Sequence, residues 1–213
     1  MTTFSNWVTV THKQMNTQEF YKSTFRKFQK KDILARYRED HRYYHNELHV
    51  KNLLKSAAKF SHKIEDIYSL YLMIWYHDVV YIPKNNDNEE ISAQFAASSM
   101  QLVLDRSTID KIYSAIIFSK HKYKSNCFSP DIQIFLELDL EILGALPETY
   151  KKYSENIEKE YTAFFTKEKY VQGRIKFIND MLGKLPIFYT EELQHKNFTS
   201  EKNLTRELKK LTS

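Results

Sequence analysis

The chain has 213 residues, 42% of them hydrophobic and 28% charged, and 32 Lys and Arg against 27 Asp and Glu give a formal net charge of +5. Basic and acidic residues are interspersed, which is typical of a solvated surface and excludes a basic nucleic-acid-binding arm. Only three glycines occur, too few for a Walker loop or a Rossmann fingerprint, so any bound phosphate must be held by metal and side chains.

In the first half of the chain, the apolar pattern predicts a series of helices. Apolar residues at helical spacing over 50–58 indicate an amphipathic helix that starts near His49. The segment 64–80 is apolar almost all round, which predicts a central helix buried by its neighbours. After a proline and the sequence NND, Asp87 to Glu90 has the pattern of a capping box that opens the next helix, whose small residues permit a close helix crossing.

The second half continues the helical pattern. Thr108 can cap the helix that follows it. Pro130 precedes DIQIFLELDLEIL, an amphipathic helix expected to end at Gly144. Further helices are expected over about 149–165 and over VQGRIKFINDML and SEKNLTRELKKL. Strand signals are weak throughout, so the predicted fold class is all-α.

Imidazole and carboxylate side chains recur inside these apolar helices. Any one of them taken alone is most often a satisfied core histidine, a cap or an ion-pair member. An ionised carboxylate inside a core costs several kcal/mol unless it is paired or bound to metal, and Asp78 and Asp139 both occupy positions that the pattern predicts to be buried. Such groups can satisfy one another by sharing a divalent cation. The candidates are His45, His49, His77, Asp78, His121, Glu137 and Asp139.

Other features predict a soluble, cytoplasmic protein. The single cysteine, Cys127, cannot form an internal disulfide, which fits a reducing compartment. The N-terminal stretch MTTFSNWVTVTHKQ lacks the basic segment and apolar run of a signal peptide. No apolar segment reaches about 18 residues, so no membrane partner is expected.

The order of these residues resembles a known family. A histidine, then His-Asp, then a distant Asp, each on its own helix, is similar to the HD superfamily of metal-dependent phosphohydrolases, and in particular to the bacterial proteins identified as predicted metal-dependent HD phosphohydrolases. The resemblance runs from about Arg36 to near the C-terminus and implies an HD-domain helical bundle with extra N- and C-terminal helices. No internal repeat or linker-like stretch divides the chain, so one domain over 1–213 is expected, and the resemblance implies a metal-site core at about 36–145 with the helices of 146–213 packed on it. The similar blocks are HRYYHNELHV, WYHDVVY, NEEISAQFA, LELDLEILG, YKKYSENIEKEY, GRIKFINDML and KNLTREL.

Carried over by position, the resemblance implies four metal ligands, which are His49, His77, Asp78 and Asp139. His49 is preferred over His45 because it directly precedes the apolar helix, and His45 would then support a ligand or contact phosphate. Asp78 would also contact the attacking water and so act in catalysis. The identity of the divalent ion (Mn, Fe, Co, Ni, Zn or Mg) and the number of ions stay open.

Several positions near these ligands have more than one interpretation. Glu89 or Glu90 could orient a water or bind a second metal, or could simply favour the helix dipole. His121 could contact substrate or a second metal. The chain has Glu137 where the family branch usually has Asp, and Glu158 where it tends to have Arg, which removes a candidate phosphate-binding cation.

The implied activity is hydrolysis of a phosphate ester or anhydride by metal-activated water. The expected partner is a small phosphate compound. The tyrosines near the ligands could stack a base, which favours a nucleotide, although ordinary packing explains them as well in a chain with 15 Tyr. Basic side chains near the ligands could hold phosphate oxygens, although a solvated surface position is the more common explanation for any single one. The candidate substrate-binding residues are Arg42, His45, Tyr81, Lys84 and His121, with Lys120 and Lys122 close to them in sequence.

Three other readings compete with this one. An alarmone hydrolase of the same superfamily would carry an acidic pair after His-Asp-Val-Val, where this chain has Tyr81 and Ile82. A non-catalytic HD sensor that binds a metal or a nucleotide would share the ligands but show no turnover. A purely structural helical protein would leave the buried carboxylates without partners.

Overall fold

The computed structural model describes residues 30–213, and over this range the chain folds into helices without a strand. The predicted all-α class is therefore confirmed for the described residues. Most of the expected N-terminal extension lies outside them, and its described part is α2 (Lys30–Arg36). None of the described helices is long and apolar enough to cross a membrane.

Helix α4 (Ile67–Tyr76) is the buried central helix that its composition predicts. Every residue from Ser69 to its end is buried. The helix is shorter than the apolar run, because Asp66 caps it by accepting a hydrogen bond from the Ser69 N–H at 3.0 Å and the helix ends just before His77. The helices packed against it are α3 (Glu47–Lys59), α5 (Asn88–Met100), α6 (Arg106–Phe118) and α7 (Pro130–Asp139).

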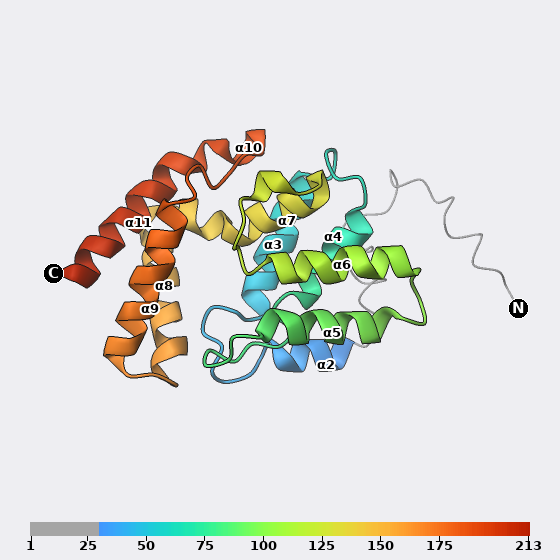
Figure 1. Cartoon of the computed structure of the whole chain (residues 1–213), viewed down its shortest axis with the longest axis horizontal. Helices are drawn as coiled ribbons and strands as arrows, with labels where there is room; N and C mark the ends of the chain where they lie inside the picture. The colour runs from blue at the N-terminus through green and yellow to red at the C-terminus, as the bar shows by residue number, and fades with distance from the viewer. Residues whose placement is uncertain (1–29) are drawn as a thin grey trace, which may run out of the picture.

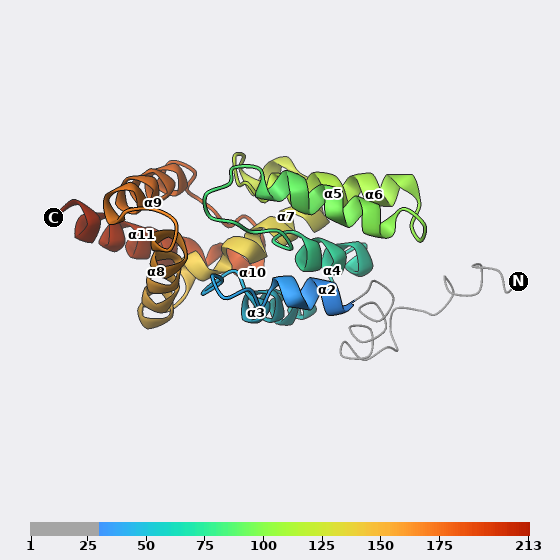
Figure 2. The same cartoon turned by 90° about the horizontal axis from the view of Figure 1, so that it is seen from below.

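Helices α5 and α6 form a closely packed pair that lies side by side in Figures 1 and 2. The small residues Ala93 and Ala96 of α5 are fully buried, as expected for a close crossing. The side chain of Asn88 fixes the loop before α5. Its Oδ1 accepts a hydrogen bond from the Ile82 N–H, and its Nδ2 donates one to the Ile82 carbonyl, both at 3.0 Å. This loop directly follows the His-Asp pair, so Asn88 helps to position it.

The caps of these two helices differ from the prediction. Asp87 is the N-cap of α5, but its side chain makes no capping hydrogen bond. Asp105, and not Thr108, caps α6: its carboxylate accepts a hydrogen bond from the Thr108 N–H at 3.0 Å. The helix therefore begins three residues earlier than predicted, and the N–H of Thr108 is one of the free groups of its first turn that the cap satisfies.

Helix α7, which follows the short 3-10 helix η2 (Ser125–Cys127), ends at Asp139. The chain continues as a second 3-10 helix, η3 (Leu140–Gly144), so the single helix predicted to reach Gly144 is in fact two elements. At Gly144 a Cβ would lie 2.5 Å from the Cβ of Lys196, the first residue of α11 (Lys196–Thr212). The close approach of α11 therefore requires glycine at this position.

The C-terminal helices α8 (Pro147–Thr162), α9 (Lys167–Leu182) and α11, with the short α10 (Glu191–Gln194), lie near the predicted ranges. Figure 1 shows α8, α9 and α11 at the end of the molecule that lies away from α5 and α6. Helices α8 and α11 contact η3, and α9 contacts both of them. Arg174 of α9 donates to the two carboxylate oxygens of Glu207 on α11 at 2.9 and 3.0 Å. A buried ion pair thus joins α9 to α11.

Candidate metal centre

The ends of two helices place a pair of buried histidines. His49 lies in the first turn of α3, whose N-cap Asn46 accepts a hydrogen bond from the Leu48 N–H at 2.9 Å. His77 directly follows the last residue of α4. The two residues are 4% and 1% exposed, and their Nε2 atoms are 3.2 Å apart. The central helix therefore brings one imidazole against the start of α3.

The orientation of His77 is set by a backbone group. Its Nδ1 lies 2.9 Å from the carbonyl oxygen of Ile74. Because a carbonyl only accepts, Nδ1 carries the hydrogen, and in the neutral ring the lone pair of Nε2 faces His49. Metal-binding histidines are commonly oriented in this way by a hydrogen bond from the other ring nitrogen.

Two carboxylates complete the cluster. Asp139 ends α7, and its Oδ1 lies 3.2 Å from Nε2 of His49 and 3.4 Å from Nε2 of His77. Its other oxygen, Oδ2, lies 2.8 Å from Nε2 of His121. Oδ2 of Asp78 lies 3.0 Å from Nε2 of His77 and 3.8 Å from Nε2 of His49. The structure thus brings together the four side chains that the resemblance implies as metal ligands.

The donor atoms have the spacing of a coordination site. Those of His49, His77 and Asp139 all lie within 4.8 Å of one another, and Asp78 adjoins both imidazoles. Ligand atoms at about 2.0–2.2 Å from one ion lie about 3–3.5 Å from their neighbours, close to the distances between these atoms. Two imidazoles and two carboxylates suit Fe, Mn, Co, Ni or Zn. The residues therefore fit a divalent ion.

Burial and charge act against each other at this cluster. Burial favours the neutral form of Asp139, but the charge of His77 and hydrogen bonds from the histidines hold the pKa of Asp139 well below its ordinary value. The pKa of Asp78 is lowered against burial in the same way, chiefly by His77. Burial alone would lower the pKa of His77, but the two carboxylates raise it well above its usual value, whereas burial lowers the pKa of His49. The carboxylates therefore stay ionised, and the charge of His77 is their neighbouring cation.

A buried carboxylate that the sequence analysis missed holds His45. Glu160 of α8 accepts hydrogen bonds from the backbone N–H of His45 at 2.9 Å and of the preceding residue at 2.7 Å, and its Oε2 lies 2.7 Å from Nδ1 of His45. Burial alone would lower the pKa of His45, but Glu160 raises it above its usual value. The His45 ring stacks on Tyr81 with centroids 4.0 Å apart. The signal in the sequence was a carboxylate on the same helical stripe as the buried Tyr153 and Ile157.

Arg42 does not contact the place where substrate would bind. Its side chain is fully buried and is not part of the cavity wall. Its guanidinium donates to the backbone carbonyls of His45 at 3.1 Å, Asp78 at 2.6 Å and Val79 at 3.2 Å, and to the carboxylate of Glu39 at 2.9 Å. The predicted phosphate contact is not supported, because these donors are used inside the protein. Arg42 instead fixes the backbone that carries Asp78.

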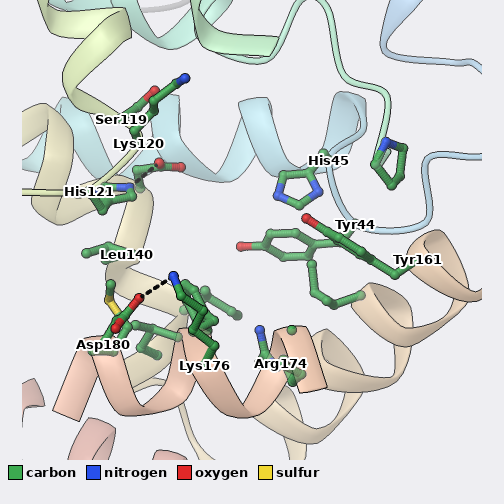
Figure 3. Close-up of a pocket in the computed structure, with 18 of the residues that line it drawn as sticks. Tyr44, His45, Ser119, Lys120, His121, Leu140, Tyr161, Arg174, Lys176 and Asp180 are labelled. Carbon is green, nitrogen blue, oxygen red and sulfur yellow. Dashed lines mark hydrogen bonds and ion pairs between the residues drawn. The ribbon is translucent and has the colours of Figure 1, made fainter. Parts of the chain in front are cut away.

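A cavity of about 1000 Å³ opens beside the cluster. Asp78 and Asp139 form part of its wall, and so do His45, Tyr81 and His121, which the sequence predicts to contact substrate. Figure 3 shows His121 and Lys120 on one side of the cavity, His45 with Tyr44 and Tyr161 on another, and Arg174, Lys176 and Asp180 of α9 along a third.

The other predicted acidic and basic residues divide between the cavity and the outside. Glu89 lines the cavity, and its pKa is raised by burial. Glu90 is not part of the wall, and its carboxylate lies 2.6 Å from Nζ of Lys120, which does line the cavity. Lys84 also lies outside the wall, with Nζ 5.6 Å from the ring centre of Phe164. Glu89 is therefore the better candidate of the acidic pair, and substrate contact by Lys84 is not supported.

His121 and Glu137, both left open by the sequence, have different surroundings. His121 has φ 51°, a left-handed conformation that residues other than glycine seldom adopt and that clusters at functional sites. Its Nε2 is hydrogen-bonded to Oδ2 of Asp139 at 2.8 Å, and its backbone carbonyl accepts a hydrogen bond from Nζ of Lys184. Glu137 is fully buried and accepts hydrogen bonds from the backbone of 189–190 at 3.0 Å each. Glu137 therefore holds the chain before α10, away from the cluster.

The chain's own contacts define the candidate site. No protein-family model, curated protein or solved structure matches the chain. The residues that meet at the cluster or the cavity wall are His45, His49, His77, Asp78, Tyr81, Glu89, His121 and Asp139, whereas Arg42, Lys84 and Glu90 lie outside.

Proposed function

We propose that the chain is a metal-dependent phosphohydrolase of the HD type that its sequence resembles, acting on a nucleotide-like small molecule. The observation that carries the proposal is the convergence of His49, His77, Asp78 and Asp139 at the wall of a cavity of about 1000 Å³. A divalent ion held by these four side chains would lower the pKa of a bound water and neutralise a phosphate oxygen.

The chain's own residues would orient the attack. Asp78 lies in the cavity wall and its lowered pKa keeps it ionised, so its carboxylate can accept a hydrogen bond from the attacking water and orient it. Arg42 holds the Asp78 carbonyl at 2.6 Å and thereby fixes the position of that carboxylate. Lys120 and Lys122, both in the cavity wall, can bind the remaining phosphate oxygens.

His45 is the candidate proton donor to the leaving group. Glu160 is hydrogen-bonded to Nδ1 of His45, so Nε2 is the ring nitrogen that can reach a ligand in the cavity. The pKa of His45 is raised, which keeps its ring protonated closer to neutral pH. As the bond between phosphorus and the leaving oxygen breaks, the proton moves from Nε2 to that oxygen, and His45 becomes neutral. Glu160 then stabilises the ring in the orientation needed for reprotonation.

Metal content, measured by mass spectrometry after incubation with Mn, Fe, Co, Ni or Zn, tests the centre itself. The wild type is expected to hold about one equivalent, as a four-ligand site does, and His77→Ala and Asp139→Ala are expected to lose it. His62→Ala and Asp110→Ala, which change exposed residues of the same types, should retain it. Absence of metal from the wild type would leave the cluster as a buried hydrogen-bonded group and contradict the proposal.

Turnover tests the reaction. The loaded protein is assayed with phosphomonoesters, phosphodiesters and nucleotides, and Asp78→Asn is expected to lower kcat about 100-fold or more on any substrate that is cleaved. Metal binding without turnover on the whole panel would instead identify a non-catalytic binding protein.

A further inference from the structure

The cavity has a second wall, formed by one face of α9, that the proposed reaction does not use. Lys169, Gly173, Lys176 and Asp180 follow one another at intervals of three or four residues, and Lys184 lies just past the end of the helix. Residues at this spacing share one face of a helix. All five line the same cavity as the metal centre.

This face, with Lys184 beside it, carries cations that are only partly neutralised. Lys176 has Asp180 at 3.4 Å, the contact drawn in Figure 3. Among the described residues, neither Lys169 nor Lys184 has a carboxylate within 4.0 Å, and Lys184 only donates to the carbonyl of His121. Apart from Asp78 and Asp139, the cavity wall contains six Lys or Arg side chains and two acidic ones. Two of the six, Lys120 and Arg174, are also paired with Glu90 and Glu207, which lie outside the wall. A metal ion would balance Asp78 and Asp139, so the rest of the cavity favours an anion.

Gly173 has no structural explanation within the protein. Glycine in the interior of a helix is destabilising relative to alanine. A Cβ at Gly173 would meet nothing within 4 Å, in contrast to Gly144, where it would clash. A bare stretch of backbone in a cavity wall allows a bound molecule to approach closely. Gly173 lies between Lys169 and Lys176, so that molecule would meet both cations.

Aromatic rings form another part of the wall. Tyr44, Tyr81, Tyr161 and Phe165 line the cavity, and such rings stack well on planar groups. A cavity of about 1000 Å³ is large enough for a ligand of nucleotide size.

We propose that the α9 face, made of Lys169, Gly173 and Lys176 with Lys184 beside it, is a second anion-binding end of the cavity, and that the ligand is a nucleoside with two separated phosphate groups. One phosphate lies at the metal centre, and this part of the proposal rests on the proposed function. The other lies among the lysines and packs against the backbone at Gly173. The α9 face contributes binding only, and no bond is made or broken there.

Calorimetric binding of matched probes tests this proposal. Adenosine 3′,5′-bisphosphate is compared with the 3′- and 5′-monophosphates, on metal-loaded protein and on protein kept metal-free with a chelator so that hydrolysis does not interfere. The bisphosphate is expected to bind the loaded wild type about 10-fold more tightly than either monophosphate, in line with one added charge-assisted contact. The double variant Lys169→Gln/Lys176→Gln should lose this advantage, while Lys209→Gln, an exposed lysine of α11 outside the cavity, should keep it.

Gly173→Ala provides a test in which folding is not at risk. The variant should melt at the same temperature as the wild type or higher, yet bind the bisphosphate about 10-fold more weakly, because the added methyl group occupies the space of the phosphate. The effects of both α9 changes should persist in metal-free protein, which separates them from failure of the metal centre. Equal binding of the three probes, no binding of the bisphosphate, or indifference to both α9 changes would overturn the proposal.

Discussion

At the scale of single residues, buried carboxylates orient imidazoles at two neighbouring places. Asp139 turns one oxygen toward the buried His49 and His77 and binds His121 with the other at 2.8 Å. Glu160 holds His45 at 2.7 Å. In both cases the hydrogen bonds favour the charged carboxylate, which in turn sets the ring's orientation. The chemistry at each imidazole therefore depends on a partner from another helix.

The role of Arg42 can be tested at this scale. Arg42→Met removes the hydrogen-bond donors to three backbone carbonyls, among them that of Asp78. Because each buried group left unsatisfied costs about 1–3 kcal/mol, we expect the free energy of unfolding, measured by urea denaturation, to fall by about 3 kcal/mol or more. Metal content should fall with it, since the backbone of Asp78 loses its support.

Arg38→Met is the matched control for this change. Arg38 is exposed and pairs with Glu47 at 2.8 Å on the surface, where ion pairs contribute little, so stability and metal content should stay close to those of the wild type. If Arg42→Met instead kept full stability and raised only KM, Arg42 would be the phosphate contact predicted from the sequence.

At the scale of helices, the candidate centre is assembled from helix ends. His49 is in the first turn of α3, His77 directly follows α4, and Asp139 is the last residue of α7. A residue at a helix end can point along the helix axis as well as sideways, so ends from different directions can meet at one point. The early end of α7 and the change to η3 are therefore part of how Asp139 reaches the cluster.

The ion pair between α9 and α11 makes stability depend on pH. Burial alone would raise the pKa of Glu207, but Arg174, Tyr150 and Ser154 lower it below the ordinary 4.5. A carboxyl group with a lowered pKa stabilises the fold above its unfolded pKa, and this contribution is lost as the pH falls through the folded value. At pH 7, Glu207→Gln should lower the free energy of unfolding by about 3–5 kcal/mol, because Arg174 is left buried without a counter-charge.

Denaturant unfolding at several pH values measures this effect. The difference between wild type and Glu207→Gln should be complete above about pH 4.5 and should shrink at lower pH. Glu201→Gln changes an exposed residue of the same helix and should show no comparable loss. A difference that stays constant down to about pH 3 would mean that Glu207 does not titrate differently in the folded state.

At the scale of the whole molecule, the cavity depends on both groups of helices. Residues near α4, α6 and α7, such as Asp78 and His121, form one part of its wall, and residues of α8 and α9, such as Tyr153 and Lys176, form another. The net charge of +5 is modest, but apart from Asp78 and Asp139 the cavity wall contains six Lys or Arg side chains and two acidic ones. The local field should therefore matter more than the overall charge.

Ionic strength measures that field. For an anionic substrate, kcat/KM should fall as salt rises from about 0.01 M to about 0.15 M, because the screening length shrinks from about 30 Å to about 8 Å, while kcat at saturation changes little. The salt dependence should be weaker in Lys169→Gln/Lys176→Gln and unchanged in Lys209→Gln. Equal weakening in both variants would assign the attraction to the overall charge instead of the cavity.

The sequence by itself determined the helical class, the approximate ranges of most helices and a set of candidate side chains that includes those meeting at the cluster. These follow from local information: apolar spacing sets helix faces, and a carboxylate on an apolar face needs a partner wherever it folds. The choice of four ligands among those candidates came instead from the family resemblance. Helix ends were less accurate, as at Asp105 and Asp139, because caps and 3-10 turns depend on neighbouring elements.

Only the tertiary structure decided which polar side chains face the cavity. The neighbouring sequence does not distinguish Arg42, whose guanidinium donates to three backbone carbonyls inside the protein, from Lys176, which lines the cavity wall. Glu160 meets His45 across 115 residues of chain, and no helical pattern encodes such a contact. The reason is physical: the partners of a polar side chain come from helices distant in sequence, and the packing of their apolar faces sets which of those helices meet.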